Sequence, residues 1–214
     1  MLGLKEGERA MESKFKKSCD RRVAIFFAEG LEEVEALAPA DILFRAGVPC
    51  DLVAVGSDLL VQSSHDVYVR CDCSITDADF DFDNYDLLFL PGGMPGTLNL
   101  KVCEPLCAAL LRFAEAGRGQ GSAGKQLAAI CAAPSILAEL GLLEGKRATT
   151  NPGFQDVLSE HAAHVCANEP VVEDDNIITS QGMGTAVDLG LALVRRLCGK
   201  EAAERVKSGI VVLH

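Results

Sequence analysis

The segment at residues 22–28 (RVAIFFA) is apolar at nearly every position. A strand with one face in solvent alternates apolar and polar residues, whereas an unbroken apolar strand is covered on both faces, as in a parallel sheet. Further apolar runs follow at residues 50–55 and 85–90. These runs predict a parallel sheet with both faces buried.

Segments with helical spacing separate the strands. Residues 31–46 carry Glu32 and Glu33 in the first turn, where acids complement the helix dipole, and Gly47 follows as a stop signal. Further helices are expected directly after Cys131 and at residues 106–116, 154–161 and 185–197. Further strands are expected at residues 164–167 and 176–179. Residues 59–62 and 67–71 are expected to form a hairpin at the sheet edge. The alternation predicts an α/β fold, a doubly wound, mostly parallel sheet with helices on both faces.

The composition restricts the kinds of molecule that the chain is expected to bind. The 214 residues suffice for one buried core, and 31 acidic against 20 basic residues give a net charge of −11. This charge disfavours nucleic acid and anionic membranes, and no apolar run approaches the roughly 20 residues that span a bilayer. Nine cysteines without framework spacing indicate free thiols in a reducing compartment, so we expect a cytoplasmic location.

The first 20 residues are polar and precede the first strand. They include Glu6, Glu8 and Glu12, which argues against a mitochondrial transit peptide. We therefore expect residues 1–20 to form a flexible extension and residues 21–214 to form a single domain.

Cys131 stands between an apolar strand and a new helical segment (QLAAICAAPSIL, residues 126–137). A side chain at such a strand-to-helix elbow projects at the carboxyl edge of the sheet, beside the free N–H groups of the next helix. These groups favour a readily ionised thiol and a nucleophilic role. The same pattern also fits a small buried cysteine that fills a strand end.

Two other turns are expected at the same edge of the sheet. Glu29 and Gly30 follow the first strand, and the turn at residues 91–96 (PGGMPG), with Gly92 and Gly93, follows another. Ligands of such sheets bind beyond the carboxyl ends of the strands, where glycine amides can face them directly. These turns and Cys131 therefore predict one site.

The partner of the thiol is not fixed by spacing. Of the four histidines, His65 lies in the expected hairpin turn, His161 and His164 lie in a polar stretch, and His214 is terminal, so none is marked as a base. Glu35 and Glu33 each share a helical stripe with apolar residues, so either carboxyl group could be buried near the thiol.

Cys71-x-Cys73 and Cys103-x₃-Cys107 lack the second pair of a zinc site, and we expect no metal.

Four motifs together carry a family resemblance: GLEEVE at residues 30–35, LPGG at 90–93, AAICAAP at 128–134 and TSQGMGTA at 179–186. In this order and spacing the chain resembles the ThiJ/PfpI superfamily from about residue 21 to residue 213. The resemblance implies a flavodoxin-like fold, a homodimer and no cofactor.

The resemblance also assigns roles. It implies that Cys131 is the nucleophile, that Glu35 rather than Glu33 is the acid hydrogen-bonded to it, and that the amides at Gly93 and Ala132, with Gly92 beside them, bind the substrate oxygen. Members of the superfamily convert methylglyoxal-type α-oxoaldehydes to hydroxy acids and remove early glycation adducts from proteins or nucleotides. Others are redox-sensing chaperones, and some carry an older label of thiazole monophosphate biosynthesis.

Two positions depart from the family pattern. Deglycase-type members have a Thr-His-Pro segment near the nucleophile, whereas this chain has Asn151 in place of the histidine. Asn151 can hydrogen-bond a substrate but cannot move a proton. PfpI-type peptidases place a histidine directly after the nucleophile, where this chain has Ala132, so a peptidase is disfavoured.

Overall fold

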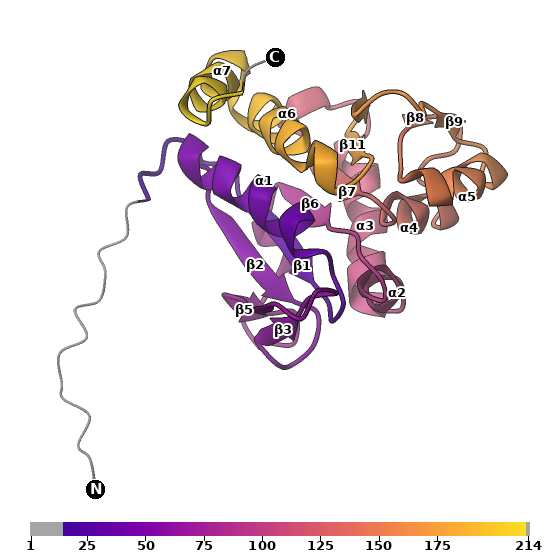
Figure 1. Cartoon of the computed structure of the whole chain (residues 1–214), viewed down its shortest axis with the longest axis horizontal. Coiled ribbons are helices and arrows are strands. Elements are labelled where there is room, and N and C mark those ends of the chain that lie inside the picture. Colours follow the sequence, from indigo (N-terminus) through magenta and orange to yellow (C-terminus); the bar gives the residue numbers. More distant parts are fainter. Residues whose placement is uncertain (1–14, 213–214) are drawn as a thin grey trace, which may run out of the picture.

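Seven strands form one sheet at the centre of the computed structural model, which describes residues 15–212 (Figure 1). The strand order is β10–β11–β7–β6–β1–β2–β5, and every neighbouring pair is parallel except β10 and β11. The strands are β1 (Val23–Phe27), β2 (Cys50–Ala54), β5 (Cys73–Ser74), β6 (Leu87–Leu90), β7 (Gln126–Ile130), β10 (Val171–Asp174) and β11 (Ile177–Ser180).

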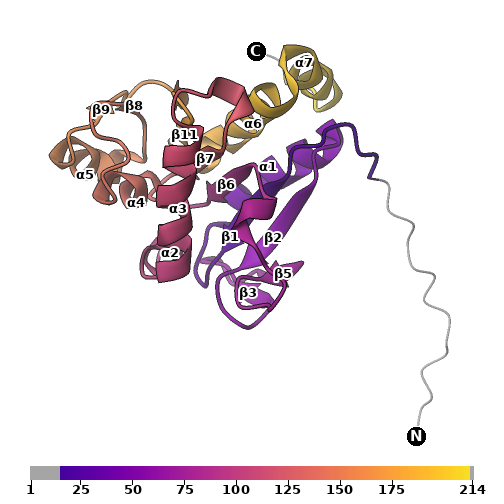
Figure 2. The same cartoon turned by 180° about the vertical axis from the view of Figure 1, so that it is seen from behind.

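Helices cover both faces of this sheet. One face packs against α1 (Glu33–Ala46), α6 (Ala186–Cys198) and α7 (Lys200–Gly209). The other packs against α2 (Gly96–Lys101), α3 (Glu104–Gly117), α4 (Pro134–Glu139) and α5 (Gln155–Glu160). Figure 1 shows α1 and α6 in front of the strands. Figure 2 shows the molecule from behind, with α3 in front of the strands. The predicted doubly wound α/β fold is confirmed.

The position of β1 between two helical layers explains why its sequence is apolar at every position. Val23, Ile25 and Phe27 belong to the core beneath α1 and α6, whereas Ala24 and Phe26 belong to the core beneath α3. Since successive side chains of a strand point to opposite faces, a strand between two helical layers needs apolar residues at every position.

The predicted hairpin forms, but not at the edge of the central sheet. β3 (Leu60–Gln62) and β4 (Tyr68–Arg70) pair with each other in a separate two-stranded sheet, and the short strand β5 occupies the edge beside β2. A second small sheet joins β8 (Arg147–Ala148) to β9 (His164–Val165). The helices α2 and α7 and the strand β10 were not expected, because each is short or mainly polar in sequence.

Part of the expected flexible extension is fixed to the domain. Residues 1–14 lie outside the described residues. The ring of Phe15 lies 5.4 Å from that of Phe44, measured between centroids, and the Ser18 hydroxyl donates to the Ala46 carbonyl at 2.6 Å. The Ser18 N–H also donates to the Gly47 carbonyl, at 2.9 Å. Phe15 and Ser18, which precede β1, therefore contact the end of α1.

Among residues 15–212, no helix has both the length and the apolar character required to cross a membrane.

The contact between α1 and α6 gives a test of the packing. A Cβ atom added at Gly190 would lie 2.7 Å from Ile42 Cδ1 and 3.2 Å from Pro39 Cα, so the two helices meet at a position without a side chain. We expect Gly190→Val to destabilise the fold by about 1–3 kcal/mol, because the added methyl groups force the helices apart. Thermal unfolding measures this.

The matched control is Gly209→Val at the end of α7, where nothing lies within 4 Å of the added Cβ. Its melting temperature should stay near that of the parent chain. Equal melting temperatures for both variants would contradict the close approach of α1 and α6.

Candidate active site

Three neighbouring strands bring the site together. β1, β6 and β7 are parallel neighbours, with Ile25 beside Phe89 and Leu90 beside Ala129. After β1 the chain builds β2 on one side, and it later returns to build β6 on the other, so the order reverses at β1 and β6. Ligand sites of such sheets lie at this switch point, and the predicted convergence of the three turns is confirmed there.

The backbone of Cys131 forms the predicted elbow. Its φ is +62°, in the left-handed region, which costs a non-glycine residue about 1–3 kcal/mol. Its N–H donates to the Ser180 carbonyl at 3.0 Å, and its carbonyl accepts from the Asn151 N–H at 3.0 Å and the Thr150 hydroxyl at 2.5 Å. These three hydrogen bonds hold the strained residue in place.

The structure selects Glu35 as the partner of the thiol. Glu35 is only 1% exposed, and its carboxylate accepts hydrogen bonds from the Cys131 thiol and from the Gly92 N–H, the latter at 3.0 Å. The Met183 N–H also donates to it. Glu33 instead faces His65, whose Nδ1 lies 3.1 Å from Glu33 Oε2. Spacing left both carboxyl groups open, and only Glu35 reaches Cys131.

Burial raises the pKa of Glu35 to about 7. The nearby carboxylate of Glu32 raises the pKa further, while the hydrogen bonds from Cys131, Gly92 and Met183 partly offset both effects. Glu35 therefore gains and loses its proton near neutral pH, which suits a group that must do both during a reaction.

The thiol itself is not readily ionised, contrary to the prediction. Burial, followed by the negative charge of Glu35, raises the pKa of Cys131 to about 12. The N–H groups of Ala132 and Gly93 hydrogen-bond to the sulfur and lower the pKa, but by less. The following helix α4 has only six residues, so its dipole is small. Cys131 and Glu35 thus compete for one proton, and the thiolate is stabilised only when Glu35 is protonated.

The two glycines of the LPGG motif have different roles. A Cβ at Gly92 would lie 2.6 Å from both Cys131 Cβ and Glu35 Oε2, so only glycine lets the pair approach. The Gly92 N–H donates to Glu35, at 3.0 Å. The amides of Gly93 and Ala132 face the sulfur, as expected of donors to an oxygen that forms there.

Asn151 lies beside the pair across a small space. A methyl group added at Gly182 would lie 3.7 Å from Glu35 Oε1, 3.8 Å from Asn151 Nδ2 and 3.9 Å from Cys131 Sγ. Asn151 Oδ1 accepts from the Gly153 N–H at 3.0 Å, which orients the side chain. Gly182 and Met183 were not predicted as site residues, although the TSQGMGTA motif that contains them was a signal.

Metal ligands are not gathered at Cys131. Within residues 15–212, the group of His, Cys, Asp and Glu side chains close enough to share an ion is Glu32, Glu33 and His65, with ligand atoms within 4.8 Å of one another. His65 is 63% exposed on its side chain and already paired with Glu33. Cys71 packs in the core beneath α1 and α6, whereas Cys73 packs against the core beneath α3.

The raised pKa of Glu35 gives a test of its burial. The folded chain holds this proton more tightly than the unfolded chain, whose carboxyl group has an ordinary pKa of 4.5. The stability that results is fully present below about pH 4.5 and is lost as the pH rises through about 7, by at most on the order of 3 kcal/mol. Glu35→Gln has no proton to lose, so this fall should disappear.

Urea unfolding of the parent chain and of Glu35→Gln between pH 5 and pH 8 measures how the free energy of unfolding of each depends on pH. Glu104→Gln, an exposed acid in the first turn of α3, is the matched control and should keep the fall in stability. If Glu35→Gln and the parent chain lost stability in parallel, the assignment of a buried, proton-binding Glu35 would be wrong.

Comparison with known proteins places these features in a family. Residues 21–196 match the model of the DJ-1/PfpI family. Protein dj-1beta of Drosophila melanogaster is 36% identical over 190 residues, covering 89% of this chain and 96% of the relative. The glutathione-independent glyoxalase DJ-1 of Schizosaccharomyces pombe is 33% identical over 185 residues, covering 84% of this chain and 93% of the relative.

A solved structure of oxidized Toxoplasma gondii DJ-1 superposes with a TM-score of 0.79 at 30% identity, covering 91% of this chain and all of the other. The family match, the relatives and the shared fold agree with the motifs that meet at Cys131. The chain therefore belongs to the DJ-1/PfpI family.

Proposed function

We propose that the chain is a cysteine-dependent enzyme that needs no cofactor and converts methylglyoxal-type α-oxoaldehydes, or their early adducts on proteins or nucleotides, to hydroxy acids. The observation that carries the proposal is the contact of the Cys131 thiol with a buried carboxyl group, Glu35, whose pKa is about 7. The similarity to a relative named as a glutathione-independent glyoxalase supports it.

The first step is addition of the thiol to the aldehyde. The Glu35 carboxylate takes the proton of Cys131 as the sulfur attacks, so the high pKa of the thiol does not block the reaction. A C–S bond forms, the C=O π bond opens, and the proton passes to the new alkoxide oxygen to give a hemithioacetal. The amides of Gly93 and Ala132 stabilise the negative oxygen during this step.

The second step moves hydrogen between neighbouring carbons. The Glu35 carboxylate removes the proton from the former aldehyde carbon and returns it to the adjacent carbon, while the hydroxyl proton moves to the adjacent oxygen. The product is a thioester of a 2-hydroxy acid. One carbon is oxidised and its neighbour is reduced, so no external oxidant or reductant is consumed.

Water then hydrolyses the thioester, releasing the hydroxy acid and restoring the thiol. Asn151 Nδ2 lies across the small space from Cys131 and supplies a donor to a substrate oxygen. In this scheme Glu35 carries the proton of the thiol and the proton that moves between the two carbons, so neither transfer requires the histidine of deglycase-type members.

Lactate release from methylglyoxal, measured without glutathione on the reduced protein, tests the scheme. Cys131→Ala should abolish turnover, and Glu35→Gln should lower kcat/KM by about 10²–10⁴-fold, because it removes the proton carrier. Glu33→Gln is the matched control and should retain activity. Parent-level turnover in Cys131→Ala would overturn the proposal.

Gly182→Ala tests the position of the substrate. The added methyl group makes only ordinary contacts of 3.7–3.9 Å, so the variant should fold and melt like the parent chain. It fills the space between Cys131, Glu35 and Asn151, and we expect at least a tenfold loss of kcat/KM, mainly through KM. Unchanged kinetics would place the aldehyde elsewhere.

A second candidate is a redox-sensing chaperone in which Cys131 is oxidised to a sulfinate held by Glu35. The solved structure of an oxidized relative favours it. If the lactate assay shows no turnover above that of the Cys131→Ala variant, this candidate replaces the enzyme.

We also propose a cytoplasmic homodimer. Family membership and the exposed apolar side chains Val34 and Phe44 on α1 support the dimer.

A further inference from the structure

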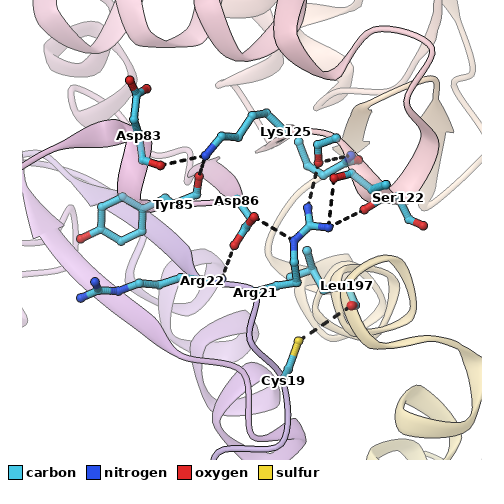
Figure 3. Close-up of polar contacts among 12 residues, drawn as sticks. Cys19, Arg21, Arg22, Asp83, Tyr85, Asp86, Ser122, Lys125 and Leu197 are labelled. Carbon is cyan, nitrogen blue, oxygen red and sulfur yellow. Dashed lines mark hydrogen bonds and ion pairs between the residues drawn. The ribbon is translucent and has the colours of Figure 1, made fainter.

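Two cysteines meet at a place far from Cys131 in the sequence and outside its site. Cys19 precedes β1, and Cys198 is the last residue of α6. The Cys19 sulfur lies 3.8 Å from the carbonyl oxygen of Leu197, the residue before Cys198 (Figure 3). The two thiols are within hydrogen-bonding range of each other. Both also pack against the core that α1 and α6 share.

The backbone around Cys19 is held on both sides. The Cys19 N–H donates to the Gly47 carbonyl at 3.2 Å. Two residues later, the Arg21 guanidinium donates to the Ser122 carbonyl at 2.7 Å and pairs with Asp86 at 3.0 Å, as Figure 3 shows. These contacts direct Cys19 toward the end of α6, so the approach of the two sulfurs is part of the folded arrangement.

The surroundings also permit thiol chemistry. Cys19 and Cys198 are both partly exposed, so a small oxidant can reach them. Burial and the neighbouring Cys19 raise the pKa of Cys198 to about 12, whereas the positive charges of Arg205 and Arg21 act in the opposite direction and stabilise its thiolate.

We propose that Cys19 and Cys198 are a redox pair that closes to a disulfide when the reduced chain meets a hydroperoxide. One thiolate attacks a peroxide oxygen, so an S–O bond forms, the O–O bond breaks and the leaving oxygen departs as water after protonation. The second thiol then attacks the sulfenic sulfur, forming the S–S bond and releasing the sulfenic oxygen as a second water. Two thiols lose two electrons, and one hydrogen peroxide becomes two waters.

The bond would join the far ends of the two helices that carry the site. Cys19 is bound to the end of α1, whose first turn holds Glu35, and Cys198 ends α6, which follows the Met183 segment. A disulfide here closes a loop that spans most of the chain, so it constrains the unfolded state strongly. No step uses Cys131, so this modification is separate from the proposed reaction.

Peptide mass spectrometry of the full chain, treated with hydrogen peroxide and digested without reduction, tests the pair. We expect a peptide that links Cys19 to Cys198 within one chain, and the oxidised protein should melt about 5–15 °C above the reduced protein. Cys19→Ser and Cys198→Ser should each lose the linked peptide and the shift in melting temperature.

Cys107→Ser is the matched control, because the Cys107 thiol also contacts a backbone carbonyl, that of Lys101 at 3.3 Å, and should keep both effects. The linked peptide should persist in Cys131→Ala, whether or not the proposed enzyme activity exists. The proposal would be overturned if, in the parent chain, Cys19 and Cys198 were oxidised singly or were linked to other cysteines. This result is read on the parent chain and does not depend on how the variants fold.

Discussion

The hydrogen-bonded contact between Cys131 and Glu35 is the interaction on which the site depends. It requires a carboxyl group from the first turn of α1 and a thiol from the end of β7 to meet over the end of β6. Gly92 makes the meeting possible, because a single carbon atom at that position would lie 2.6 Å from both partners. The surrounding hydrogen bonds, including those that hold the left-handed backbone at Cys131, maintain this geometry.

The electrostatics of this pair shape the chemistry that it can perform. Burial opposes charge on either group, so the pair retains a proton at neutral pH, and the carboxyl group is the partner that titrates near pH 7. A thiol that stays protonated at rest and loses its proton only as it attacks suits the aldehyde addition proposed above. The same protonated carboxyl group can hold an oxidised sulfur, so one geometry is compatible with both proposed functions.

Much of the fold was predictable from local patterns. The unbroken apolar run at β1 indicated a sheet covered on both faces, and the acids and the glycine around α1 marked its ends. Short elements were harder: α2 has six residues after Pro95, and β5 has two. Their formation depends on neighbouring strands and helices rather than on their own sequence, since short segments are marginal alone. The contact of Ser18 with the end of α1 could not be predicted, because a polar residue before the first strand does not indicate its partner.

The sequence by itself determined the layered α/β fold, the elbow at Cys131 and, through its motifs, the family. These follow from periodicity, turn residues and residue order, which are local properties of the chain. The tertiary structure decided that Gly92 serves Glu35, that Gly182 borders the space beside Asn151, and that the thiol resists ionisation. It also brought Cys19 to Cys198. Contacts between distant segments and the desolvation of buried groups arise only when the helices and strands pack, so spacing along the chain does not encode them directly.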